Sequence, residues 1–201
     1  THLWAEIRRL YFVEGKKKLA VKGRILCTHF GVSGPVILNS AGKVADMLHD
    51  GTVTAAIDVF PKSDLGNLDK HITKIFDDNK NRDVKNVMKF IVPTGTAPAI
   101  LTLLPKLDPD KKVHSVSRDE RKALVNLLKA LPITITGLMG YERAVVADGG
   151  LAIRDVEGKT MRSRKHANLF ITGDLLNISR PSGGYSLQLC WTTGWVAGSN
   201  A

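Results

Sequence analysis

The pattern of apolar and polar residues changes character twice along the chain. Residues 19–30 have the composition of a strand that leads into a glycine-rich turn. Pro35 then suits the first position of a helix, and apolar residues continue behind it at helical spacing. Residues 52–60 alternate between apolar and more polar side chains, which predicts a strand with one buried face.

After Pro61 the apolar period becomes helical. Apolar residues recur three or four positions apart, as on one face of a helix, at Leu68, Ile72, Ile75 and Phe76, at Val84, Val87, Met88 and Ile91, and at Ala97, Ile100, Leu101 and Leu104. Ser117 and Glu120 have the spacing of a capping box before a further apolar run. Residues 63–131 are therefore expected to form a small helical subdomain.

Strand-like segments return at Pro132. The expected strands are 133–136, 144–147, 151–153 and 168–172. The last element, residues 185–198, has the pattern of a helix, and its small residues would let it pack closely on a sheet.

Composition places the chain among globular proteins. It has 201 residues, of which 43% are hydrophobic and 24% charged. No segment reaches the roughly 18 apolar residues of a membrane span, and no signal-peptide pattern opens the chain. Cys27 and Cys190 stand far apart, which argues against a disulfide framework or a metal site. We expect a cytoplasmic protein without a membrane partner.

The chain carries a formal net charge of +10. Such a charge attracts polyanions, including nucleic acids and phosphorylated cofactors. Basic runs such as 16–18 and 162–165 are most simply explained as solvated faces, and no RNA-recognition signature or aromatic–basic interleaving accompanies them. Nucleic acid is therefore not the expected partner.

Two segments near the C-terminus have the pattern of a ligand site. The apolar strand expected at 168–172 runs into Gly173 and Asp174, and ligands of dinucleotide-binding sheets sit beyond such strand ends. Gly183, Gly184 and Tyr185 then open a helix, whose N-terminus offers unpaired N–H groups and about half a unit of positive charge. A helix terminus aimed at the pyrimidine edge of a flavin would stabilise the negative charge of its reduced form.

These segments resemble known flavoprotein motifs. Residues 167–174 resemble the second FAD motif of the glutathione-reductase-type flavoproteins. Residues 182–188 are similar to the Thr-Gly-Gly-Tyr-Asn-Leu-Gln signature of the bacterial NAD(P)/FAD-dependent oxidoreductases that include aminoacetone oxidase and the bile-acid-dehydroxylation flavoprotein. Residues 28–35, 144–150 and 160–163 resemble further blocks of that group, in the same order.

The resemblance implies a fold and a site. The fold would be α+β: a β-rich, barrel-like insert (residues 1–62 and 132–147), an inserted helical subdomain (63–131), and the C-terminal strand–helix piece of a glutathione-reductase-type FAD domain (148–201). FAD would be the cofactor, with NAD(P)H as a possible electron donor. Asp174 would hold the ribityl chain, the backbone of Gly183, Gly184 and Tyr185 would line the pyrimidine edge, and Gly149, Gly150 and Gly173 would let the chain pass close to the flavin.

The sequence contains no Gly-x-Gly-x-x-Gly, the motif that holds the pyrophosphate of FAD in the resembled group. We therefore expect an N-terminal FAD-binding segment to be missing from this chain, which alone would bind FAD weakly and be inactive. Two other interpretations stay open: a basic nucleic-acid-binding module, and a non-catalytic interaction or structural fragment.

Overall fold

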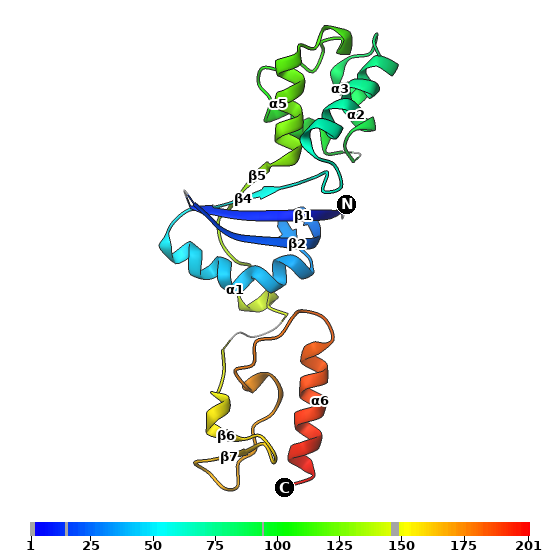
Figure 1. Cartoon of the computed structure of the whole chain (residues 1–201). Helices are drawn as coiled ribbons and strands as arrows, with labels where there is room; N and C mark the ends of the chain where they lie inside the picture. The colour runs from blue at the N-terminus through cyan, green and yellow to red at the C-terminus, as the bar shows by residue number, and fades with distance from the viewer. Residues whose placement is uncertain (1–2, 15, 94, 146–148) are drawn as a thin grey trace. The chain divides into compact units, whose positions relative to one another are not determined.

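The computed structural model describes residues 3–14, 16–93, 95–145 and 149–201, with side chains from residue 19 onward (Figure 1). By their contacts the residues divide into two compact units. The first unit comprises Thr1–Trp4, Arg24–Val53 and Thr136–Ala201, and the second comprises Ala5–Gly23 and Thr54–Ile135. Each unit is described by itself below.

Four strands have most of their residues in the second unit. The strands β1 (Leu3–Glu14), β2 (Lys16–Thr28), β4 (Val53–Ile57) and β5 (Leu131–Ile135) follow one another in the order β2-β1-β4-β5. β1 pairs antiparallel with β4, with Leu10 opposite Ile57. Burial alternates along β4, as its pattern predicts, whereas β1 is a strand that the apolar pattern did not single out. No sheet of the described residues closes into a barrel.

The helical period between Pro61 and Pro132 predicts its helices correctly. The structure contains α2 (Leu65–Asp78), α3 (Val84–Val87), α4 (Ala97–Thr102) and α5 (Arg118–Lys129), with the 3-10 segments η1 (Met88–Phe90) and η2 (Val113–Ser115). We refer to residues 63–131 as the helical subdomain. Its core is a single cluster whose completely buried members are Leu68, Ile72, Val84, Val87, Met88, Leu124 and Leu128.

Capping groups set the ends of these helices. The Asp64 carboxylate accepts a hydrogen bond from the Asn67 N–H at 2.7 Å and so caps α2. Ser117 and Glu120 form the predicted capping box, with bonds of 3.2 and 2.6 Å. At the other end of α5, the Ala130 N–H donates to the carbonyls of Asn126 and Leu127. The Lys129 ammonium instead ties the helix to the preceding segment, since it donates to the Asp58 carboxylate at 2.6 Å and to the carbonyls of residues 60 and 63.

In the first unit, a tight turn joins the end of β2 to a long helix. β3 (Gly31–Ser33) pairs antiparallel with the end of β2, and α1 (Pro35–Asp50) begins with Pro35, as predicted. Gly34 has a φ of 102°, and a Cβ there would lie 3.1 Å from the Arg24 carbonyl oxygen. Glycine thus lets the start of α1 approach the β2 backbone closely.

The C-terminal part of the first unit contains little regular structure before its last helix. It includes η3 (Tyr141–Arg143), η4 (Ile153–Asp155), β6 (Val156–Glu157), β7 (Arg162–Ser163), η5 (Gly173–Leu175) and α6 (Tyr185–Gly198). β6 and β7 form a two-stranded antiparallel sheet. α6 coincides with the helix predicted over 185–198.

Two predicted strands in this part are wrong, and a third lies partly outside the described residues. Ala144 and Val145 are not in a strand, and residues 146–148 lie outside the described residues. Residues 151–153 provide only an isolated bridge from Leu151 to Leu176, and residues 168–172 only one from Phe170 to Arg162. A strand needs a neighbour that continues the hydrogen-bonded ladder, and these segments meet a neighbour at a single residue each.

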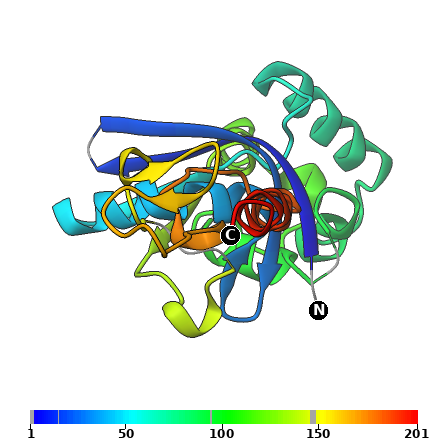
Figure 2. The same ribbon diagram turned by 90° about the horizontal axis from the view of Figure 1, so that it is seen from below.

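α6 packs mainly against η5 (Figure 2). Thr193 and Ala197 are its buried residues, while Trp191 and Trp195 are 66% and 74% exposed. The close packing on a sheet that its small residues suggest is not what buries α6, because a Cβ at Gly194 or Gly198 would meet nothing within 4 Å. No helix in the described part of the chain is long and apolar enough to cross a membrane.

Candidate functional site

The glycine pair at 149–150 lies against the segment that follows η5. Gly150 has a φ of 119°, and a Cβ there would lie 2.6 Å from the Leu175 carbonyl oxygen. The Leu151 N–H donates to that same carbonyl at 2.8 Å, and the Asn177 N–H donates to the Leu151 carbonyl at 2.9 Å. The structure thus brings residues 149–151 alongside residues 173–177, although the two segments are more than 20 residues apart in sequence.

The backbone of Gly173 packs closely against α6. Its φ is 61°, and a Cβ there would lie 2.8 Å from the Cys190 Sγ. Its N–H donates to the Thr193 hydroxyl at 2.9 Å, and that hydroxyl donates to the Leu189 carbonyl at 2.7 Å. The role of Gly173 in this structure is therefore a close backbone approach to α6, which places Asp174 beside the start of that helix.

Asp174 is held by an arginine. Arg180 donates from Nη2 to the Asp174 carboxylate, from Nε to the Ser186 hydroxyl at 2.8 Å, and from Nη1 to the Ile178 carbonyl at 2.7 Å. The Arg180 side chain is only 7% exposed, whereas Asp174 is 43% exposed. Arg180 therefore fixes one carboxylate oxygen against the first turn of α6 and leaves much of the carboxylate open to solvent or a ligand.

The start of α6 is open. Gly184 is the N-cap residue, and no side chain of the described residues caps the helix. A Cβ at Gly183 or Gly184 would meet nothing within 4 Å, and Tyr185 is 60% exposed. The first-turn N–H groups of a helix have no intrahelical partner, so this terminus can donate hydrogen bonds to an anionic or carbonyl oxygen of a ligand.

The loop before α6 contacts the start of α1. The Ser182 N–H donates to the Asn39 side-chain oxygen at 2.6 Å, and the Ser182 hydroxyl lies 3.4 Å from the Pro35 carbonyl. Two sequence blocks that resemble the same flavoprotein group, 28–35 and 182–188, thus meet within the first unit.

Aromatic and basic side chains gather at the first of these blocks. The rings of His29 and Phe30 pack edge to face with centroids 4.7 Å apart. The Arg143 guanidinium lies 5.4 Å from the Phe30 ring centroid, and Phe30 is 46% exposed. Nearby in β2, burial raises the pKa of the Cys27 thiol, which keeps it protonated at neutral pH and argues against a thiolate nucleophile.

The structure adds residues that the sequence patterns did not identify. Arg180, Thr193 and Asn39 each hold part of the candidate site, but none belongs to a recognisable spacing. The only available signal was that Arg180 stands six residues after Asp174 in a short loop, where an opposite charge often forms an ion pair. Among the described residues, no cluster of three or more His, Cys, Asp or Glu could hold a metal ion.

Comparison with known proteins identifies relatives of most of the chain. A 3-dehydro-bile acid delta(4,6)-reductase from Clostridium scindens is 26% identical over 180 residues, which cover 89% of this chain and 44% of that protein. A ribosomal RNA dihydrouridine synthase from Escherichia coli is 24% identical over 172 residues, which cover 86% of this chain and 40% of that protein. The chain thus spans less than half the length of these curated relatives.

A family model describes the larger part of the sequence. The model of the HI0933-like protein barrel and H2TH domain matches residues 4–146, which include the helical subdomain and both long N-terminal strands. The mixture of strands and helices agrees with that description in outline, and the reductase among the relatives agrees with an oxidoreductase relation. The chain belongs to the HI0933-like protein family.

Proposed function

We propose that this chain is the C-terminal portion of an FAD-dependent oxidoreductase. The single observation that carries the proposal is the open N-terminus of α6, where a Cβ at Gly183 or Gly184 would meet nothing within 4 Å and where Arg180 links Asp174 to Ser186 in the first turn. The remaining part of the cofactor site would come from the longer protein, since the relatives extend well beyond the matched region.

The residues present fit a flavin. The uncapped first turn of α6 offers backbone N–H donors and a partial positive charge to the pyrimidine edge. The half-open Asp174 carboxylate can accept a hydrogen bond from a ribityl hydroxyl, and Arg180 holds it in place. Gly149 and Gly150 would let the chain pass close to the flavin, and Gly150 packs its backbone against Leu175.

The chemistry would belong to the cofactor. When bound, FAD supplies hydride transfer, with NAD(P)H as the proposed electron donor. The chain's own contribution would be to bind and orient the flavin and to stabilise negative charge at the helix terminus.

The decisive experiment is an FAD titration of the longest gene product that contains these 201 residues. Gly184→Val should weaken FAD affinity at least tenfold, because its side chain would fill the space beside the helix terminus. Gly158→Val is the matched control, since a Cβ at either glycine meets nothing within 4 Å and neither change should unfold the protein. Equal FAD affinity in both variants would refute the site.

Asp174 gives a second test of the same proposal. A hydrogen bond to a charged acceptor is worth about 1.5–3 kcal/mol, so Asp174→Ala should weaken FAD affinity roughly 10- to 100-fold. Asp174→Asn keeps an oxygen that can accept from Arg180 and should lose less. If Asp174→Ala lowers the melting temperature by the same amount with and without FAD, the carboxylate serves Arg180 alone and is not a flavin ligand.

A polyanionic substrate is the second element of the proposal. The relatives' names point to two substrate classes, a bile acid and ribosomal RNA. The charge of +10 did not by itself make nucleic acid the expected partner, but beside a relative named for ribosomal RNA it favours the RNA, because a large positive charge attracts polyanions and gives a steroid no comparable advantage. Reduction of a base in RNA by the flavin-loaded protein, with no reduction of an unsaturated steroid, would support this choice. The reverse result would refute it.

A further inference from the structure

The helical subdomain has an exposed aromatic side chain flanked by two cations. Phe90, the last residue of η1, is 48% exposed. The Lys89 ammonium lies 5.2 Å from its ring centroid, and the Arg82 guanidinium lies 5.9 Å from it. Both cations are themselves exposed. We call Arg82, Lys89 and Phe90 the cation–aromatic surface.

Among the described residues, these two cations differ from their neighbours in having no acidic partner. Lys85 pairs with Asp110, and Lys112 pairs with Asp83 at 2.8 Å. Arg82 and Lys89 form no ion pair with any residue in the part of the chain that the structure describes. The charge at Phe90 is therefore left uncompensated, while the charge on either side of it is neutralised.

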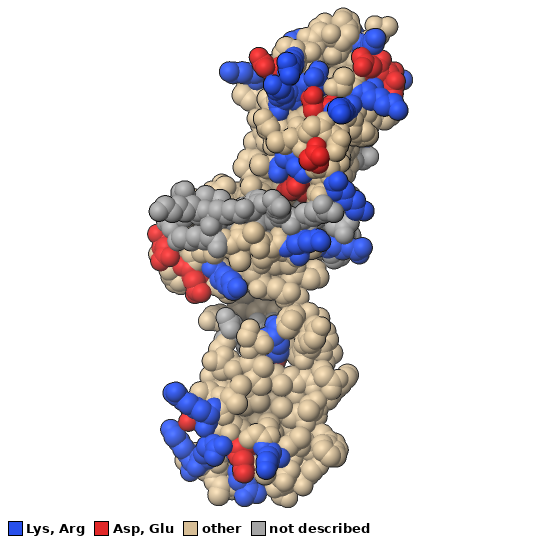
Figure 3. Space-filling view, viewed as in Figure 1, with Lys and Arg blue, Asp and Glu red and all other residues tan. Residues whose placement is uncertain are grey.

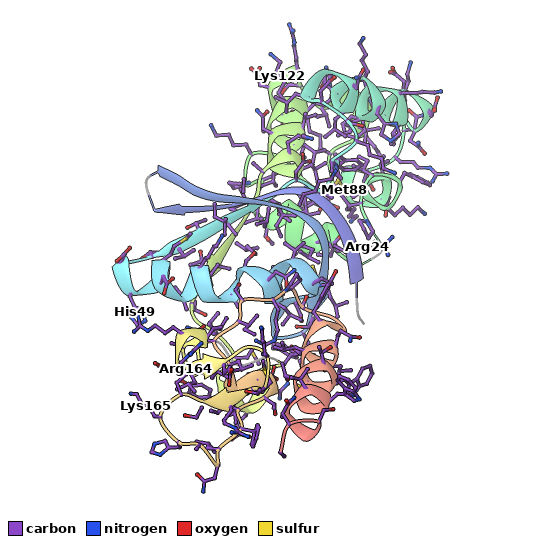
Figure 4. All side chains as sticks on the ribbon, turned by 60° about the horizontal axis from the view of Figure 1, so that its bottom comes forward. Arg24, His49, Met88, Lys122, Arg164 and Lys165 are labelled. Atoms are coloured by element: carbon purple, nitrogen blue, oxygen red, sulfur yellow. The ribbon has the colours of Figure 1, made fainter. Side chains whose placement is uncertain are left out.

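A buried anchor holds the exposed ring in position. Val87 and Met88, which directly precede Lys89, are completely buried in the core of the helical subdomain. Met88 is labelled in Figure 4. Phe90 itself is not among the buried residues of that core, so its ring contributes little to the stability of the subdomain. Because the neighbouring residues are buried, the backbone that carries the ring needs little ordering when a ligand stacks on it.

The surroundings of this surface are also basic overall. Residues 63–131 contain 13 Lys and Arg against nine Asp and Glu, a net charge of +4. Acidic and basic side chains are interspersed on the face of the subdomain seen in Figure 3. A continuous basic stripe, which would suit the regular backbone of a duplex, is not what this face presents. The two cations lie over the ring, and when they turn toward phosphates the ring is open to a base, so the combination suits an unstacked base and its adjoining phosphates.

We propose that the cation–aromatic surface binds single-stranded RNA, with a base stacked on Phe90 and the flanking phosphates contacted by Arg82 and Lys89. The choice of RNA over DNA rests on the RNA substrate proposed above, since stacking and phosphate contacts are common to both. The surface would dock RNA on the helical subdomain and does not depend on bound flavin.

The test measures binding of a fluorescently labelled, uridine-rich single-stranded RNA of about 12 nucleotides to the flavin-free chain. Phe90→Leu, which keeps an apolar side chain but removes the aromatic face, should weaken binding about tenfold, and Phe90→Trp should retain it. Arg82→Ala and Lys89→Ala should each weaken binding and each lower the slope of log affinity against log salt by about 0.7.

Two control variants separate this surface from general electrostatics. Lys122→Ala removes an exposed charge on α5 that forms no ion pair within the described residues, and Leu103→Ala removes an apolar side chain that is 46% exposed. Each should change the affinity less than twofold. Equal losses for Lys122→Ala and Lys89→Ala, or no loss for Phe90→Leu, would overturn the proposal.

The same binding experiment is repeated with two further ligands. Single-stranded DNA of the same sequence should bind with similar affinity, because stacking and phosphate contacts are common to both nucleic acids, and binding of DNA without binding of RNA would overturn the assignment to RNA. Vesicles containing anionic lipid should not compete with the RNA, and vesicle binding that depends on Phe90 in place of RNA binding would also overturn it. Because no flavin is present, a negative result here leaves the FAD titration unaffected, and loss of FAD binding in Gly184→Val leaves this test unaffected.

Discussion

Gly173 packs against the middle of α6, whereas Gly184 directly precedes its first residue, and glycine serves a different purpose at each position. Gly173 has a left-handed backbone and no room for a Cβ, because the Cys190 Sγ would lie 2.8 Å from it. Gly184 has an ordinary backbone conformation and open space. The first glycine is required by the fold itself, whereas the second is required only if a ligand occupies that space.

This difference predicts the behaviour of Gly173→Ala. The left-handed conformation alone costs a residue with a Cβ roughly 1–2 kcal/mol, and the contact with Cys190 adds to it. We expect a lower melting temperature in the absence of any ligand. In a Cys190→Ala background, Gly173→Ala should lose the steric part of this cost and keep the backbone part. An unchanged melting temperature for Gly173→Ala would contradict the close approach to α6.

At the scale of elements, the helices of the helical subdomain begin where local side chains satisfy their free N–H groups. Ser117→Ala removes the hydroxyl that accepts from the Glu120 N–H, and loss of such a cap costs about 1 kcal/mol. Thermal unfolding should report this loss. Ser115→Ala is the control, because Ser115 is exposed in η2 and lies outside the cap. Equal melting temperatures for the two variants would show that the capping box contributes nothing.

The same capping box makes the subdomain sensitive to acid. The Glu120 carboxylate accepts hydrogen bonds from the Ser117 N–H and from the Lys111 ammonium at 2.9 Å. Both bonds lower the pKa of the Glu120 carboxyl, the Ser117 bond more than the Lys111 bond. The Arg121 guanidinium lowers the pKa of Asp69 in the same way. A carboxyl whose pKa is lower in the folded than in the unfolded state stabilises the fold above its unfolded pKa. That stabilisation is lost as the pH falls through the folded value.

We therefore expect the free energy of unfolding to fall as the pH is lowered below about 4.3, the unperturbed pKa of Glu. Glu120→Gln can still cap the helix but cannot titrate. The free energy of unfolding of this variant should therefore depend less steeply on pH below about 4.3. Urea unfolding at a series of pH values measures this slope. A variant with the same slope as the wild type would exclude Glu120 as a source of the acid sensitivity.

At the scale of the whole molecule, the chain consists of two units with their own buried clusters. The cluster of the helical subdomain lies entirely in the second unit, and a smaller cluster of Val156, Ile171 and Leu176 lies in the first. The candidate flavin site belongs to the first unit and the cation–aromatic surface to the second. The two proposed functions can thus be tested separately by mutation.

Separate clusters predict separate effects on stability. Leu124 is completely buried, so Leu124→Ala should destabilise the helical subdomain by about 2–5 kcal/mol. Hydrogen exchange should quicken in residues 63–131 while the protection of α6 amides stays as in the wild type. Leu103→Ala, at an exposed position, should leave both regions unchanged. Equal loss of protection in α6 would show that the two units unfold together.

The sequence alone determined the elements whose signals are local. The positions of α1, α2, α5 and α6 follow from helical periodicity, from Pro35 and from the capping box of Ser117, because each of these interactions joins residues within about four positions. The alternation of β4 and the family blocks around residues 28–35 and 182–188 were likewise readable from the chain.

Only the tertiary structure decided the rest. The strands predicted over 151–153 and 168–172 failed because strand formation depends on a distant neighbour, which no local pattern reports. Three kinds of contact join residues without a recognisable spacing. They are the ion pair of Arg180 with Asp174, the hydrogen bond of Ser182 to Asn39, and the cation–π contact of Arg82 with Phe90. Such contacts arise when the folded chain brings separate segments together, so their energies depend on packing and burial that the sequence order does not record.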